Sequence, residues 1–88
     1  MNNKLTPSEE ELVLLILKNK SLPRSEIREL LNAATEEKTM TLTLTLEILN
    51  FRGLVIELES FPPIYQITKE GRESLIIAEN IRVKAEGR

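Results

Sequence analysis

The chain has 88 residues and a formal net charge of −2, and cysteine and histidine are both absent. Their absence excludes disulfides, thiol nucleophiles, the usual zinc ligands and the side chain that most often moves protons near neutral pH. Aspartate is absent as well, so all 14 acidic side chains are glutamates. We therefore expect no catalytic residue, no metal site and no cofactor.

The size and composition are typical of one soluble globular domain, which we expect to span residues 1–88. No segment reaches the roughly 18 consecutive apolar residues that a membrane-spanning helix needs. The N-terminal segment also lacks the apolar region of a signal peptide. We expect the protein to be cytoplasmic and, because its core is small, to form a homodimer.

The first predicted helix begins with a capping-box pattern at residues 6–9, in which Thr6 is the N-cap and Pro7 the first helical residue. Residues 12–17 are apolar without a break, which a buried strand would also show, but the cap and the acidic first turn favour a helix. Such a helix is apolar on more than one side. Three of its residues are expected to face a second subunit: Val13, Leu14 and Leu17.

The second predicted helix covers residues 24–34 and follows a turn at Pro23, because the residue before a proline is disfavoured in a helix. A polar connection over residues 35–38 comes next, with a length typical of a helix-turn-helix. The inward face of the second helix is expected to carry three apolar residues at helical spacing: Ile27, Leu30 and Leu31.

Residues 39–46 support two interpretations. Threonine alternates there with methionine or leucine, which is typical of a strand. However, Leu42, Leu46 and Leu49 also lie at i, i+4 and i+7, and the segment ends at Gly53, as a helix C-cap should. We predict a helix that ends before Gly53, with a strand over residues 41–46 as the alternative.

A β-hairpin is predicted over residues 54–60 and 64–68, with the turn at residues 61–63. Strand alternation places Glu57 and Glu59 on the outward face. The inward face of the first strand is expected to carry three apolar residues: Leu54, Ile56 and Leu58.

The last predicted helix covers residues 69–86, with Thr68 as its cap. Its core face is expected to carry four apolar residues: Leu75, Ala78, Ile81 and Ala85. Further apolar residues lie beyond this face, and we expect them to contact a second subunit: Ile76, Ile77 and Val83.

Three segments carry a resemblance to a known family. Residues 42–55 have the spacing of a recognition helix that runs into a first wing strand, and residues 64–72 look like a second wing strand that runs into a C-terminal helix. With residues 25–31 as the second helix, the chain resembles the winged helix-turn-helix domains of PadR-like and MarR-like regulators. The resemblance implies an α+β fold that is mostly α, and a transcription regulator that binds double-stranded DNA as a homodimer.

In such families the third helix enters the major groove and the wing reaches a neighbouring groove or phosphate. The corresponding exposed positions of the third helix are Thr41, Thr43, Leu44, Thr45, Glu47 and Ile48. Threonine hydroxyls can donate to phosphates and threonine methyls can contact thymine, while basic side chains neutralise phosphates. The candidate DNA-binding residues are Arg24, Arg28, Lys38, Thr39, Thr41, Thr43 and Thr45.

The charge around the predicted recognition helix and wing supports an alternative. Residues 40–67 contain Arg52 against Glu47, Glu57 and Glu59, a net charge of −2. An acidic surface repels a phosphate backbone and attracts a basic partner. The alternative function is a winged-helix module that binds a protein partner without binding DNA. It would use an apolar surface on the third helix, at Leu44 and Ile48, together with the acidic wing.

Overall fold

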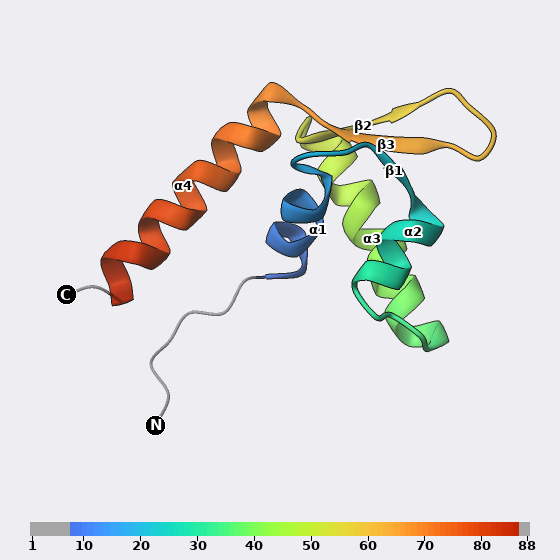
Figure 1. Cartoon of the computed structure of the whole chain (residues 1–88), viewed down its shortest axis with the longest axis horizontal. Coiled ribbons are helices and arrows are strands. Elements are labelled where there is room, and N and C mark those ends of the chain that lie inside the picture. The colour runs from blue at the N-terminus through green and yellow to red at the C-terminus, as the bar shows by residue number, and fades with distance from the viewer. Residues whose placement is uncertain (1–7, 87–88) are drawn as a thin grey trace.

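A computed structural model describes residues 8–86 of the chain. Its elements are α1 (Glu9–Leu17), β1 (Leu22–Pro23), α2 (Arg24–Leu30), α3 (Glu36–Phe51), β2 (Val55–Leu58), β3 (Ile64–Ile67) and α4 (Lys69–Glu86). Helices α1, α2 and α3 pack together, the β2–β3 hairpin extends past them, and α4 lies beside α1 on the side away from α2 (Figure 1). This is the predicted order of helices and hairpin. No helix within residues 8–86 combines the length and apolar character that crossing a membrane requires.

Helix α1 starts later than the sequence predicted. Ser8 has an extended backbone (φ −72°, ψ 167°), and its hydroxyl accepts a hydrogen bond from the Glu11 N–H at 3.2 Å. Ser8 is therefore the N-cap, which makes the prediction of an N-cap at Thr6 wrong, since that would require a helical Ser8. Thr6 and Pro7 themselves lie outside the described residues.

The apolar side of α1 that we expected at a second subunit lies instead in the core of its own chain. Val13, Leu14 and Leu17 are all buried, and they pack with leucines of α3 and with Val55 and Ile67 of the sheet. Their assignment to a dimer interface is wrong, because side chains enclosed within one chain offer no surface to another.

Helix α2 is shorter than predicted. Asn32 adopts a left-handed backbone (φ 58°), its N–H donates to the Glu29 carbonyl, and the Ala33 N–H donates to the Arg28 carbonyl, each at 3.0 Å. These paired bonds form a Schellman motif that ends the helix at Leu30. Leu30 is exposed, contrary to the expected inward face, whereas Ile27 is buried and Leu31 packs against the core.

The predicted polar connection at residues 35–38 is mostly helix. The Thr35 hydroxyl accepts from the Lys38 N–H at 3.1 Å and caps α3, so the turn between α2 and α3 comprises residues 31–35. The hydroxyls of Thr39, Thr41 and Thr43 donate to carbonyls four residues earlier at 2.9–3.0 Å. The threonines are therefore accommodated within a helix, and the strand alternative is excluded.

The predicted end of α3 is confirmed at Gly53. This glycine has a φ of 78°, and the N–H groups of Gly53 and Leu54 donate to the carbonyls of Asn50 and Leu49 at 3.1 and 2.9 Å. Glycine adopts this left-handed conformation without a steric penalty. The chain reverses at this point into the sheet.

The sheet has three antiparallel strands in the order β1-β3-β2, with Val55 opposite Ile67 and Leu22 opposite Tyr65. Val55 and Ile67 point into the core, whereas Ile56 and Leu58 are exposed on the other face. The predicted inward face of the first strand is therefore wrong for Ile56 and Leu58. Leu54 is buried, but it lies in the turn before the strand.

Helix α4 begins as predicted. The Thr68 hydroxyl accepts from the Gly71 N–H at 3.0 Å and donates to the Gly53 carbonyl at 2.7 Å. Leu75 is buried against the core, and Arg82 forms an ion pair with Glu11 of α1 at 2.5 Å. The exposed apolar residues of α4 are Ile76, Ile77, Ile81 and Val83, so the prediction that Ile81 lies on the core face is wrong, and Ala78 is half-buried. The side chain of Ala85 lies outside the described part of the chain.

Candidate nucleic-acid interface

One side of α3 faces α2 and the wing, and it brings together four of the predicted DNA-binding residues. Arg24 Nη1 donates to Thr43 Oγ1 at 3.1 Å, which links the start of α2 to the middle of α3. A shallow groove there is lined by residues of α2, by Thr39 and by the wing: Pro23, Arg24, Ser25, Arg28, Thr39, Pro62, Pro63 and Tyr65. Two guanidinium groups and Thr39 thus line the groove between the helix-turn-helix and the wing tip, and Thr43 adjoins it through its hydrogen bond with Arg24.

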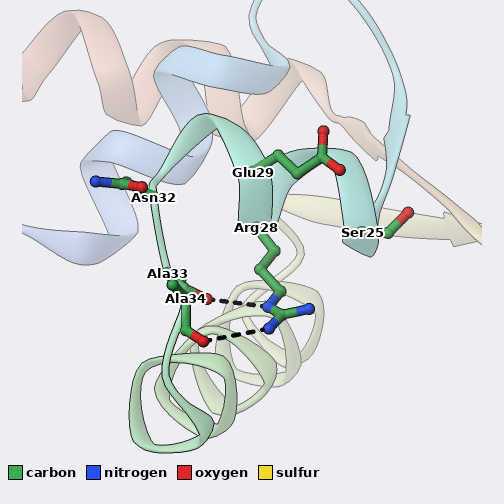
Figure 2. A pocket seen from close by; sticks show the side chains of 6 residues that line it. All are labelled: Ser25, Arg28, Glu29, Asn32, Ala33 and Ala34. Carbon is green, nitrogen blue, oxygen red and sulfur yellow. Dashed lines mark hydrogen bonds between the residues drawn. The ribbon is translucent and has the colours of Figure 1, made fainter.

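Arg28 has a structural role as well as a place in this groove. Its Nε donates to the Ala33 carbonyl at 2.9 Å and its Nη2 donates to the Ala34 carbonyl at 3.5 Å, which holds the turn between α2 and α3 (Figure 2). In Figure 2 the third guanidinium nitrogen points away from both carbonyls. Arg28 is therefore positioned to offer one outward donor while its other nitrogens hold the backbone.

The remaining predicted residues do not lie in the groove. Lys38 and Thr41 lie on the opposite side of α3, where they line a depression beside Glu9 and Leu12 of α1. Thr45 has only 6% of its surface exposed and is packed within the chain. Its assignment as an exposed DNA-contacting residue is wrong, because it shares the inward face of α3 with the core leucines.

The outward face of α3 is apolar and acidic. Met40, Leu44, Ile48 and Phe51 are 64%, 53%, 46% and 93% exposed. Glu47 is exposed on the same face, one turn from both Leu44 and Phe51. Sequence reasoning identified Leu44 and Ile48 but missed Met40 and Phe51, although all four recur at i, i+4, i+8 and i+11.

The pKa of Tyr65, on β3, is shifted by charged side chains of α2, α3 and the wing. Partial burial raises the pKa of its phenol, Glu57 raises this pKa further, Arg24 opposes the shift, and Glu47 adds a small increase. The phenol therefore lies within reach of two carboxylates and one guanidinium. The groove is lined by two arginines and no carboxylate, but the effect of Glu57 and Glu47 on Tyr65 shows that negative charge acts at its edge, in contrast to the uniformly basic surface typical of strong nucleic-acid binders.

Comparison with known proteins supports the fold. No protein-family model and no curated protein matches the chain. Among solved structures, it is similar to a PadR family transcription regulator from hypervirulent Clostridium difficile R20291, with a TM-score of 0.70 and 24% sequence identity over 81% of this chain and 82% of that one. The predicted fold class is confirmed: a mostly helical α+β winged helix-turn-helix with a hairpin wing and a C-terminal helix.

Proposed function

We propose that this protein is a winged-helix transcription regulator that binds double-stranded DNA as a homodimer. The fold makes this class of function the first to test, since a similar solved structure is described as a PadR family transcription regulator. The observation that carries the proposal is the groove between α2, α3 and the wing, where Arg24 is held against Thr43 at 3.1 Å. A guanidinium fixed beside the third helix is suited to a phosphate contact that sets the orientation of that helix on the duplex.

The groove contains few cations, and this limits the expected affinity. Arg24 and Arg28 supply positive charge, whereas Glu47 and Glu57 lie close to the same region. Each phosphate neutralised contributes a salt-dependent increment to binding. We therefore expect modest affinity that depends on few ionic contacts, with base contacts supplied by the Thr43 hydroxyl or methyl group.

The DNA-binding proposal is tested by selecting bound fragments from a random duplex pool at two salt concentrations and then measuring variants on the enriched sequence. Arg24→Gln is expected to weaken binding to all sequences about tenfold and to reduce the slope of log affinity against log salt by about 1, because one phosphate contact is lost. Lys84→Gln, which removes an equal charge from the last turn of α4, is the matched control and should leave affinity unchanged. Absence of any enriched motif at low salt would contradict the proposal.

The homodimer proposal relies on α4. This helix exposes Ile76, Ile77, Ile81 and Val83, while its contacts with the rest of the chain include buried Leu75 and the Arg82–Glu11 pair. An 18-residue helix with this much uncovered apolar surface is suited to an interface with a second copy of itself. A palindromic DNA site with half-sites one helical turn apart would match such a twofold dimer.

Charge placed on this surface should separate the subunits. Ile77→Glu is expected to convert a dimer into a monomer in light scattering at micromolar concentrations, because two carboxylates would be brought into one apolar interface. Leu30→Glu, at an equally exposed leucine of α2, is the control and should remain dimeric. A wild-type protein that is already monomeric under these conditions would refute the dimer and leave the DNA-binding test unaffected.

A further inference from the structure

The outward face of α3 carries a continuous apolar stripe, formed by Met40, Leu44, Ile48 and Phe51. These residues recur at about one-turn intervals and cover about 16 Å of helix. Isolated exposed apolar residues are common on protein surfaces, but four aligned on one helix face form a patch of the kind that marks an interaction site. None of the four belongs to the core cluster of the chain.

Three glutamates of α3 border this stripe, and Arg24 lies on its α2 side, where it donates to Thr43. Glu36 and Glu37 lie at its N-terminal end, one turn before Met40, and Glu47 lies beside its C-terminal half. Lys38, the single cation of α3, and the C-cap Arg52 are on the α1 side, where Arg52 pairs with Glu10 at 2.6 Å and Lys38 lines a depression with Glu9. The wing adds Glu57 and Glu59, and residues 53–68 contain no lysine or arginine.

We propose that the stripe is the binding site for a basic amphipathic helix of a partner protein. Apolar residues of such a helix, spaced at i, i+4 and i+7, would pack between Leu44, Ile48 and Phe51. Its flanking lysines or arginines would lie against Glu36, Glu37 and Glu47. Charge complementarity of this kind speeds association and selects partners of the opposite sign.

The same charges argue against other occupants. In a symmetric contact with a second copy, Glu47 and the two glutamates at the start of α3 would face groups of equal charge. An anionic membrane surface would be repelled as well. A cationic helix is the occupant that satisfies both the apolar stripe and its acidic border.

Binding of the helix does not require DNA, but a regulatory consequence follows from the proposed function. A partner that covers the outward face of α3 would lie beside Thr43, the residue that the proposed function places at the bases. The partner and DNA would then compete for the protein, and the basic helix would release the regulator from its site. This consequence alone rests on the proposed function.

The probe is a synthetic amphipathic peptide of about five helical turns, with leucines on one face and lysines on its borders. Fluorescence anisotropy of the labelled peptide with the full chain is expected to show saturable binding. An otherwise identical peptide with glutamate in place of lysine, and one with the leucines and lysines in shuffled order, should bind at least about tenfold more weakly. Equal binding of all three peptides would overturn the proposal.

Variants locate the site. Leu44→Glu and Glu47→Lys should each weaken peptide binding by about tenfold or more, the first by placing charge in the stripe and the second by removing an attraction and adding a repulsion. Leu30→Glu, on the exposed side of α2, is the control and should bind as the unmodified protein does. Circular dichroism checks that each variant is folded. Unchanged binding in Leu44→Glu would overturn the proposal whatever the outcome of the DNA measurements.

Discussion

Replacement of Gly71 by alanine is expected to lower the free energy of unfolding by about 3 kcal/mol, the upper end of the usual range for overpacking. A Cβ on Gly71 would lie 2.2 Å from the Leu54 carbonyl oxygen and 2.7 Å from Ile67 Cγ1. The Leu54 carbonyl is held in place by the Thr68 N–H at 3.0 Å, so the backbone cannot move aside without loss of that bond. The first turn of α4 must therefore shift away from the sheet. Urea denaturation followed by circular dichroism measures the loss.

Gly53→Ala is the matched control, because alanine there strains the backbone conformation without a steric clash. Nothing lies within 4 Å of a Cβ at Gly53, but its φ of 78° is unfavourable for alanine. The left-handed conformation costs roughly 1–2 kcal/mol, offset in part by the reduced freedom of the unfolded chain. We expect a loss of about 1 kcal/mol. A Gly71→Ala variant no less stable than Gly53→Ala would contradict the close approach of α4 to the sheet.

The sequence predicted the order of elements because its strongest signals are local. Gly53 ends α3 by a left-handed turn, Thr68 caps α4, and Leu42, Leu46 and Leu49 recur at helical spacing. Each of these depends on residues within about two turns of one another. Helix boundaries were less well predicted, since Thr6 and Ser8 are both able to cap α1.

The sequence predicted the wrong residues of the first wing strand to face the core, and the reason is physical. Leu54 is buried as part of the turn that ends α3, and Val55, its neighbour, is buried as the first residue of β2. Two consecutive inward residues break the alternation of a strand. An alternating pattern counted from Leu54 therefore places Ile56 and Leu58 inward. The alternation in the structure starts one residue later, at Val55.

The candidate site was predicted only in part. Thr45 lies at i+3 from Leu42 and at i−4 from Leu49, so helical periodicity alone assigns it to the core face. The resemblance had instead placed it among exposed positions. The pairing of Arg24 with Thr43 spans 19 residues and depends on how α2 packs against α3, which no local pattern determines.

The sequence also did not determine which residues of α1 face the core. Residues 12–17 are all apolar, so several orientations of the helix would bury a similar area. Packing against α3 and the sheet selects Val13, Leu14 and Leu17. The expected dimer residues on α1 were therefore core residues, whereas those expected on α4 are exposed.

Leu46→Ala is expected to destabilise the protein by about 2–5 kcal/mol, whereas Leu44→Ala should change stability by less than about 0.5 kcal/mol. In a strand over residues 41–46, both leucines would point to the same face and the two changes would have similar effects. In α3 they point in opposite directions, with Leu46 1% exposed and Leu44 53% exposed. Truncation of Leu46 leaves a cavity among the core residues of α1, α3 and the sheet, while truncation of Leu44 removes a methyl-rich side chain from solvent.

The comparison measures the conformation of the threonine-rich segment directly. Because the total stability of a domain of this size is about 5–15 kcal/mol, loss of Leu46 would leave a protein that unfolds at far lower urea concentration. Equal effects of the two substitutions on the urea midpoint would contradict the helix. Leu44→Ala also tests the stripe on the outward face of α3. Because the stability of this variant is expected to be preserved, any loss of peptide binding would reflect a contact made by Leu44 and not a change in the fold.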